Sequence, residues 1–521
     1  MSTRKSSPIR GKFLVFSISF AVSILISACV QNPVTGEKDF LLVDEGWELQ
    51  VGAQQYLPLR QQQGGDYTTD PKVEAYVRSV GMKLAAVSDR KLPYEFNVIN
   101  DSTPNAWALP GGKISINRGL LVELKNEAEL AAVLGHEIVH AAAKHGARGQ
   151  SRGIGLQLGV VTATILAQQQ GYNGQLAQMA SSVGAQIINS QYGQGAELEA
   201  DRFGMEYMAR AGYNPKGAVN LQRTFLRLSQ GQGGDVLSRL FASHPPSAKR
   251  VTENGKTAAR LAVDGVVGEA QYKKALATLF KTKDAYAVAD KAQLALQKGD
   301  TRQAANLLRT AIRQEPRESR FHTLAGDIAL AQKNTKAAKN SYDKAISLNS
   351  EFFYNYVQRG KIYEAQNNAR AAQADYAQSI KLLPTAAAQL GLGKFAQARG
   401  NTQVARRFYS MAAQAQGAEG QRAKQALLAL QPETRNALGS SLLVRQGLTR
   451  NGTFAIEVIN QTSRPISKVT LGVRVGNGPQ RKLGINKVIP PGGRETIQTG
   501  QRMSESQADN IQVVVLNAGT R

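Results

Sequence analysis

The residues best suited to chemistry lie in one short segment, His136-Glu137-Ile138-Val139-His140. On a helix, histidines four positions apart lie one turn apart on the same face, so both imidazoles can bind one tetrahedral zinc ion. Glu137 could then reach a water on the metal and act as a base. The alternative is that two histidines merely pack on a helix. With only five histidines in the chain, the pattern arises by chance in about one chain in several hundred, which disfavours that alternative.

The surrounding sequence predicts the helix that these two histidines need. Asn126 to Glu129 has the pattern of a capping box, and an apolar stripe follows it at Leu130, Val133, Leu134 and Ile138. We expect the helix to end near Gly146, which places His145 in its last turn. A cation there favours the helix dipole, so we leave His145 out of the predicted site.

A catalytic zinc ion needs a third protein ligand and one open position. The candidate segment is Glu197 to Asp201, which opens a second predicted helix. Glu197 and Asp201 share one face with small residues, which suits packing against a metal site, whereas Glu199 and Glu206 are expected to face solvent. We predict that Glu197 binds the metal and that Asp201 orients a ligating histidine. On their own, two such acids would more often be surface residues.

The first 28 residues predict a signal peptide. Basic residues precede an apolar run from Phe13 to Ala28, which is shorter than the ~20 residues of a spanning helix. Small residues then precede the only cysteine, so the run resembles a bacterial lipobox with Cys29 as the lipidated N-terminus. Val30 follows, which favours the outer membrane under the enterobacterial sorting rule. The alternative is an ordinary signal peptide with an incidental cysteine.

The composition excludes several classes of protein. A hydrophobic fraction of 42% supplies folded cores, and 521 residues predict about three domains. One cysteine excludes an intrachain disulfide and a thiolate zinc cluster, so a metal site must use His, Asp and Glu. The formal net charge is +25, or +21 without the four basic residues of the leader. The basic residues are scattered, which indicates a solvated surface and argues against nucleic acid as a partner.

The middle of the chain predicts tetratricopeptide repeats. Four turn segments recur at spacings of 34, 34 and 33 residues, which is the period of this repeat: Gly299-Asp300-Thr301, Lys333-Asn334-Thr335, Asn367-Asn368-Ala369 and Gly400-Asn401-Thr402. About four repeats follow from this register. The concave face of such a solenoid normally binds a peptide or protein, although the array could also serve as a spacer.

The C-terminal region predicts a small β-sandwich. Segments rich in β-branched residues lie at Phe454–Ile459, Val469–Val475 and Ile511–Leu516, with turn clusters between them. An immunoglobulin-like sandwich is the expected type. The region contains no residues that suggest chemistry.

Several motifs, in order, resemble one family. Asn32 to Gly36 and Asn105 to Gly112 precede the histidine helix, and the acidic helix and His244-Pro245-Pro246 with Arg250 follow it. In this order the motifs resemble the gluzincin metallopeptidases, which include the heat-shock protease HtpX and the CAAX prenyl proteases. The most similar branch is that of periplasmic lipoproteins with tetratricopeptide repeats, the BepA-type β-barrel assembly-enhancing proteases.

The resemblance implies a multidomain fold. We expect a signal peptide at 1–28, an α+β gluzincin metallopeptidase domain at 29–265, an all-α tetratricopeptide-repeat solenoid at 266–435 and an all-β sandwich at 438–521.

The resemblance also implies one zinc ion per chain, held by His136, His140 and Glu197, with Glu137 as the base. In related proteins the histidine matching His244 occupies the open zinc position in a latent state, or contacts the substrate carbonyl together with an arginine that matches Arg250. The alternatives are a loop histidine bonded to backbone and a surface ion pair. One departure is that Tyr192 to Gly195 replaces the Ser-Arg often found before the zinc-binding glutamate, which leaves the rate of activation open.

The expected function is a zinc endopeptidase of the periplasm, lipid-anchored in a Gram-negative bacterium, that degrades unfolded or misassembled proteins, including outer-membrane β-barrels. The strand expected at Ala106–Leu109 could offer an edge to an extended substrate. The repeats could bind the β-barrel assembly machinery. The competing class is a non-catalytic assembly factor or chaperone. We favour the enzyme because a vestigial domain has no physical need to keep metal ligands and base together.

Overall fold

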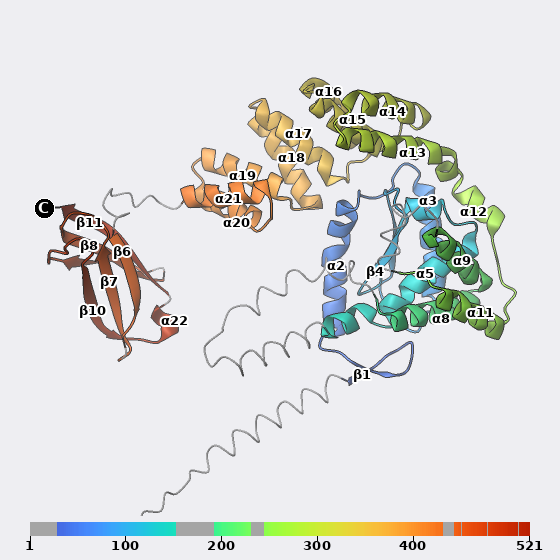
Figure 1. The fold of residues 1–521 in the computed structure, drawn as a ribbon, viewed down its shortest axis with the longest axis horizontal. Helices are drawn as coiled ribbons and strands as arrows, with labels where there is room; N and C mark the ends of the chain where they lie inside the picture. Colours follow the sequence, from blue (N-terminus) through green and yellow to red (C-terminus); the bar gives the residue numbers. More distant parts are fainter. Residues whose placement is uncertain are drawn as a thin grey trace, which may run out of the picture. The chain divides into compact units, whose positions relative to one another are not determined.

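The computed structural model describes residues 29–152, 192–230, 244–430 and 442–520, except for the single residues 450, 477 and 509. The predicted signal peptide at 1–28 lies outside the described residues. The chain divides into two compact units, residues 1–391 and 392–521, which are described separately. Figure 1 labels the helices and strands.

A three-stranded sheet forms the scaffold of the N-terminal region, with the strand order β3-β5-β4. β3 (Glu95–Ile99) runs parallel to β5 (Lys113–Asn117), and β4 (Ala106–Leu109) pairs antiparallel with β5 at the edge of the sheet. Gly111 and Gly112 both have positive φ, which lets the chain turn between β4 and β5. The strand expected at Ala106–Leu109 is therefore present, and it forms a hairpin with β5 at the edge of the sheet.

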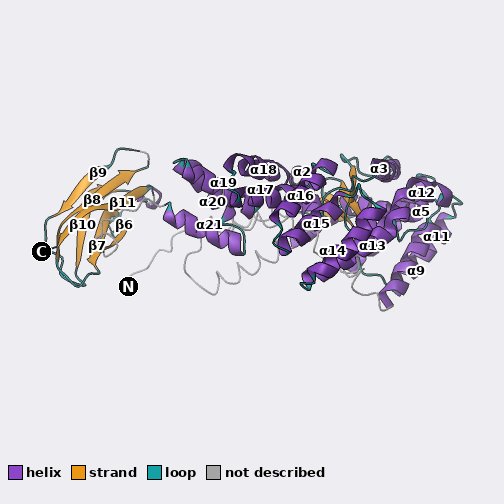
Figure 2. Ribbon diagram, turned by 90° about the horizontal axis from the view of Figure 1, so that it is seen from above, coloured by secondary structure: helices purple, strands orange, loops and turns teal. Residues whose placement is uncertain are grey.

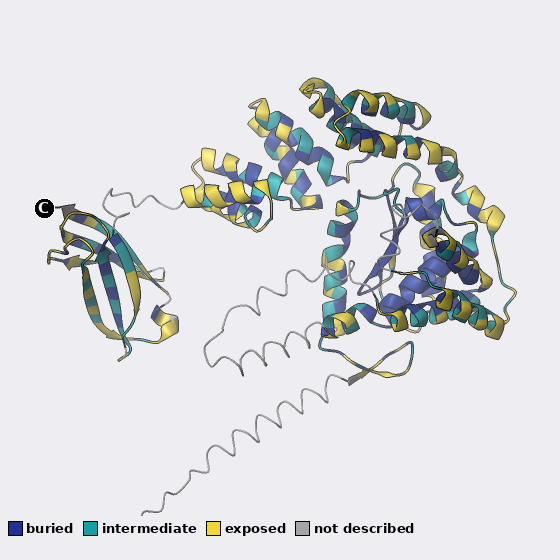
Figure 3. Cartoon of the chain, viewed as in Figure 1, coloured by how far each residue is buried: buried dark blue, intermediate teal, exposed yellow. Residues whose placement is uncertain are grey.

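Seven helices belong to this region within the described residues: α2 (Glu45–Gln62), α3 (Pro71–Ala85), α4 (Arg118–Leu121), α5 (Glu127–Ala142), α8 (Gln194–Arg210), α9 (Lys216–Gln230) and α11 (Ala248–Leu261). The first four contact the sheet, whereas α8, α9 and α11 pack on α5 or on one another. α5 passes through the core, and every residue of it after Glu127 is buried, as Figure 3 shows. The predicted cap is present, because the Asn126 side chain accepts a hydrogen bond from the backbone N–H of Glu129.

The end of α5 differs from the prediction. The helix stops at Ala142 rather than near Gly146, and Lys144 adopts a positive φ of 58°. A new helical segment starts immediately afterwards, at His145. His145 therefore does not lie in the last turn of α5, and the reversed backbone carries it in a new direction.

α5 and α8 approach each other closely through two glycines. A Cβ atom added to Gly204 would lie 3.0 Å from the backbone of Gly135 and of His136. The contact brings the histidines of α5 directly against the acidic face of α8. The small residues predicted on that face thus allow the two helices to pack backbone against backbone.

A short hairpin, β1 (Cys29–Gln31) and β2 (Lys38–Phe40), packs beside the end of α5. Asn32 joins the hairpin to the end of α5. Its side-chain nitrogen donates to the carbonyl of Ala143 at 3.2 Å, and its side-chain oxygen accepts from the backbone N–H groups of Val34 and Thr35. The Asn32–Gly36 motif is therefore a structural one. It satisfies a carbonyl beyond the helix end, where no intrahelical donor remains.

The first unit continues with the helices of the repeats (Figure 2): α12 (Glu269–Ala275), α13 (Ala277–Gln297), α14 (Thr301–Gln314), α15 (Ser319–Ala331), α16 (Thr335–Leu348), α17 (Phe353–Ala365) and α18 (Ala369–Leu382). The recurrent turns separate the two helices of each repeat. Asp300, Asn334 and Asn368 cap the second helix of successive repeats through their side chains. The predicted tetratricopeptide register is confirmed.

The repeats contact the N-terminal region within this unit. Glu318, at the start of α15, is fully buried and accepts hydrogen bonds from Thr69 and Asn100. Gln61 of α2 bonds the backbone of Glu351 and Phe353 in the next repeat. These contacts fix the first repeats on the N-terminal region.

The second unit contains α20 (Thr402–Ala412), α21 (Ala418–Ala429) and a β-sandwich, and α19 (Ala386–Ala398) spans the division between the units. One sheet has the order β10-β7-β6 and the other β11-β8-β9. These strands and a short helix, α22 (Glu505–Ala508), have the following bounds: β6 (Leu442–Leu448), β7 (Thr453–Asn460), β8 (Ile466–Val475), β9 (Arg481–Ile485), β10 (Arg494–Arg502) and β11 (Ile511–Thr520).

The inward side chains of both sheets form a single apolar core, which includes Ile456 and Leu471. The predicted fold class, with an α+β domain, an all-α repeat array and an all-β sandwich, is confirmed. Among the described helices, none combines the length and apolarity that crossing a bilayer requires.

Candidate metal site

Four buried side chains meet at one point: His136, His140, Glu197 and His244. One ligand atom from each lies within 4.8 Å of all the others. The Nε2 atoms of His136 and His140 are 3.0 Å apart, and the Glu197 carboxylate lies 3.5 Å and 3.4 Å from them. Three imidazole nitrogens and one carboxylate oxygen are the donor set of a tetrahedral zinc site. The residues present therefore fit a zinc ion.

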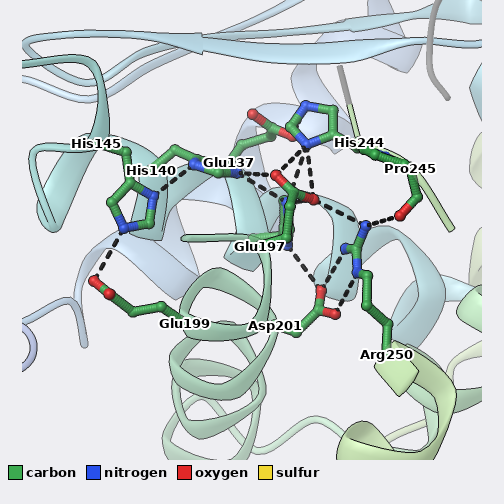
Figure 4. Close-up of polar contacts among 10 residues, drawn as sticks. Glu137, His140, His145, Glu197, Glu199, Asp201, His244, Pro245 and Arg250 are labelled. Atoms are coloured by element: carbon green, nitrogen blue, oxygen red, sulfur yellow. Dashed lines mark hydrogen bonds and ion pairs between the residues drawn. The ribbon is translucent and has the colours of Figure 1, made fainter. Parts of the chain in front are cut away.

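Three separate elements supply these ligands. α5 carries both histidines on one face, and Glu197 lies in the first turn of α8. His244 precedes α11, and its Nδ1 lies 3.3 Å from His136 Nε2 and 3.1 Å from Glu197 (Figure 4). Burial raises the pKa of Glu197, but the His244 and His136 imidazoles outweigh it and hold that pKa well below its usual range. The carboxylate is therefore ionised, as a metal ligand must be.

Asp201, itself bound by Arg250, contacts the ring nitrogen of His136 that does not face the other ligands. The Asp201 carboxylate lies 2.9 Å from His136 Nδ1, so the proton on Nδ1 leaves Nε2 free to bind a metal. Arg250 donates to both oxygens of Asp201 at 2.7 Å, and its Nη1 lies 2.8 Å from Glu197. Burial raises the pKa of Asp201, yet Arg250 and His136 lower it overall. Arg250 is thus a buried member of the site and not a surface ion pair.

His145 supports the second histidine, contrary to the sequence prediction. Its Nδ1 lies 2.7 Å from Nδ1 of His140, and its Nε2 lies 3.0 Å from the Glu199 carboxylate. Arg148 also contacts Glu199, at 3.2 Å. Glu199 therefore faces this chain of contacts and not solvent. When His140 binds a metal through Nε2, its Nδ1 proton donates to His145, which in turn donates to Glu199.

Tyr192 closes one side of the site. Its ring stacks on His140 with centroids 3.9 Å apart and an interplanar angle of 19°. The stacking further fixes the orientation of the His140 ring. The predicted departure at residues 192–195 thus contributes a side chain to the site itself.

Glu137 lies beside the four potential ligands. One carboxylate oxygen is 3.6 Å from His244 Nε2, and the other is buried with no hydrogen-bond partner in the described part of the chain. Burial raises the pKa of this carboxyl. A buried carboxylate with a free oxygen can accept a proton from a water or a substrate group that enters the site.

The structure brings together all seven residues predicted for the site in the peptidase region: His136, Glu137, His140, Glu197, Asp201, His244 and Arg250. Cys29, the predicted lipidation residue, lies apart from them in β1. Sequence reasoning missed His145, Glu199 and Tyr192. His145 reaches the site because the helix breaks after Ala142, which no sequence pattern marks, and neither of the other two residues belongs to a pattern.

Comparison with known families decides the class of this domain. The model described as "Peptidase family M48" matches residues 71–257, which include the whole site. The chain carries a peptidase family M48 domain. Tetratricopeptide-repeat models match residues 289–350 and 354–385, in agreement with the helices of the first unit. The family resemblance drawn from the sequence is confirmed, and an M48 domain implies a bound metal at this donor set.

Individual relatives are similar over part of their length. The "Putative beta-barrel assembly-enhancing protease" of Vibrio cholerae is 32% identical over 198 residues, which are 36% of this chain and 40% of that protein. The "Mitochondrial metalloendopeptidase OMA1" of Schizosaccharomyces pombe is 36% identical over 180 residues, 34% of this chain and 50% of that protein. The match thus spans half or less of these two relatives.

Among solved structures, one match is YrrB, titled a TPR protein with an unusual peptide-binding site. The match spans 42% of this chain and 96% of the YrrB chain, at 16% sequence identity. The TM-score of 0.23 is too low to compare the folds.

Proposed function

We propose that this M48 protein is a zinc-dependent endopeptidase that cleaves unfolded or misassembled proteins. The observation that carries the proposal is the meeting of His136, His140 and Glu197 at one point, with the free carboxylate oxygen of Glu137 beside them. Metal ligands and a proton acceptor within one buried cluster are what hydrolysis of a peptide bond requires.

In the proposed reaction, one zinc ion per chain is held by His136, His140 and Glu197, and when bound it acidifies a water and polarises the scissile carbonyl. Glu137 takes the proton from the attacking water and returns it to the leaving amine. Asp201 keeps His136 in the tautomer that leaves Nε2 free. Arg250 holds Asp201 and Glu197 in place, and we propose that its positive charge stabilises the substrate oxygen that becomes negative.

We propose that His244 keeps the resting enzyme latent. Its ring lies within contact of both His136 and Glu197, at the fourth corner of the donor set. A zinc ion with four protein ligands has no open position, whereas catalysis needs one. His244 must therefore move away before a substrate enters, after which it can contact the carbonyl.

The proposed substrates are extended chains. β4 is an edge strand whose free side offers backbone groups to a peptide that adds as a further strand, and Ala106 of β4 lines the same pocket as Glu137. Backbone pairing reads few side chains, so this mode selects unfolded, strand-forming segments. The names of the relatives support misassembled outer-membrane β-barrel proteins as one such class.

The remaining assignments concern location and partners. We propose that residues 1–28 are removed, that Cys29 is lipidated, and that the protein lies in the periplasm, anchored to the outer membrane. Under this proposal the peptidase domain covers residues 29–265, the repeats 266–435 and the sandwich 438–521. The repeats would hold clients or the β-barrel assembly machinery, and the lipid on Cys29 would hold the protein at the membrane.

A casein-degradation time course tests the proposal. We expect cleavage by the wild-type protein, loss of cleavage after chelation and recovery on addition of zinc. We also expect His244→Ala to cleave faster than the wild type, because the fourth position stays open. No cleavage at full zinc occupancy would contradict the proposal and favour a non-catalytic assembly factor.

A further inference from the structure

A small cavity lies directly beside the proposed base. It lies between α5, α8, α9 and α11 and is partly open, and its lining includes Glu137, Val133, Met205 and Leu221. Its volume, measured for the centres of water-sized spheres, is about 40 Å³. One water needs roughly 10–15 Å³ on this measure, so the cavity holds about three atoms of that size. It therefore has room for the side chain of a small residue.

Two amide side chains belong to the lining, in addition to the charged and histidine side chains of the metal site. Gln222 of α9 is 5% exposed and Asn254 of α11 is 2% exposed, and both line the cavity. Gln222 Oε1 and Asn254 Nδ2 are buried, and neither has a hydrogen-bond partner in the described part of the chain. Buried polar atoms are nearly always paired, and an unpaired one is costly. An acceptor and a donor therefore stand ready in the same cavity.

We propose that this cavity is the specificity subsite beside the scissile bond, and that it selects small uncharged side chains with a hydroxyl or carboxamide tip, as in serine, threonine and asparagine. The inference rests on the proposed peptidase function and names the substrate class of that site. A hydroxyl can donate to Gln222 Oε1 or accept from Asn254 Nδ2, and a carboxamide carries both a donor and an acceptor.

The pairing survives a simultaneous reversal of both amides. Exchanging oxygen and nitrogen in both side chains leaves one donor and one acceptor for the guest to satisfy. The cavity size excludes aromatic side chains. Valine fits the size but leaves both amides unpaired, and a site with unpaired polar groups rejects such an analogue strongly.

The competing explanation is that water fills the cavity and satisfies both amides. In that case the amides are structural, and the residues that flank the cleaved bond do not depend on them. Changing the amides to apolar residues of similar shape separates the two explanations.

The experiment sequences the cleavage sites in a mixture of denatured proteins, with the full chain at full zinc occupancy. The double variant Gln222→Met with Asn254→Leu removes both polar tips, and Asn220→Leu, an exposed residue of α9, is the matched control. We expect the wild type and the control to favour Ser, Thr or Asn over Val and Leu at least about tenfold at one position flanking the bond. The double variant should reverse this preference at least about tenfold while it still cleaves.

The possible results distinguish the proposed subsite from the proposed peptidase function. An unchanged preference in an active double variant would overturn the subsite but leave the peptidase standing. Absence of cleavage by the wild type would overturn the proposed function and the subsite with it. Thermal unfolding supplies a second reading: the Gln222→Met variant should melt no lower than the wild type, and a marked drop would mean that the amide is paired in the core, against the premise.

Discussion

His145 should strengthen zinc binding although it does not touch the metal. In the His145→Ala variant, the Nδ1 proton of His140 loses its acceptor at 2.7 Å, and Glu199 loses its contact at 3.0 Å. His140 is fully buried, so no bulk water replaces the lost partner. Partners of ligating histidines typically contribute 10–100-fold to metal affinity, which corresponds to about 1.4–2.7 kcal/mol.

The assay is a competition titration of apo protein against a chelator of known zinc affinity. We expect His145→Ala to weaken zinc binding at least about tenfold, and Glu199→Gln, which keeps an acceptor for His145, to weaken it less. His322→Ala is the matched control, because His322 is a partly buried histidine of the repeats whose Nε2 contacts the backbone carbonyl of Pro316. If His145→Ala folds and binds zinc as tightly as His322→Ala, the contact chain has no role in holding the metal.

Two further predictions concern stability. Gly204→Ala should lower the melting temperature, because the new Cβ lies 3.0 Å from the backbone of Gly135. Overpacking of this kind costs about 1–3 kcal/mol. That cost exceeds the ~1 kcal/mol by which alanine is a better helix former than glycine. Gly195→Ala, in the first turn of the same helix with open space around it, should not lower the melting temperature. An equal drop in both variants would refute the explanation by close helix packing. Burial raises the pKa of Asp327 above its unfolded value of ~3.9, so its ionised form opposes folding at pH 7, and this cost disappears as the pH falls through the raised pKa. Asp327→Asn should therefore melt higher than the wild type at pH 7, with the difference shrinking toward pH 4, and a difference that does not change with pH would contradict the reasoning.

Local patterns in the sequence predict the parts of the site that depend on one helix at a time. The spacing of His136 and His140, and that of Glu197 and Asp201, places each pair on one helical face, and helix packing then brings the two faces together. The regular turns of the repeats are equally local, because an Asp or Asn caps the second helix of each repeat. These features hold whatever surrounds them.

The features that sequence reasoning missed depend on local breaks or on tertiary contact. On a continuous helix, His145 would point away from His140, since five residues turn through about 140°. The positive φ of Lys144 reverses the chain and makes the contact. β10 was not predicted because the described residues of this strand are partly or fully exposed, so it lacks the alternation of apolar residues that marks the strands β7 and β8.

The most direct test of the central claim measures zinc content and casein cleavage together in the Glu137→Gln variant. Glu137 acts as the base and is not a metal ligand, so the glutamine variant should bind as much zinc as the wild type and lose cleavage. Loss of zinc from this variant would contradict the ligand assignment, and retained cleavage would contradict the role of Glu137 as the base.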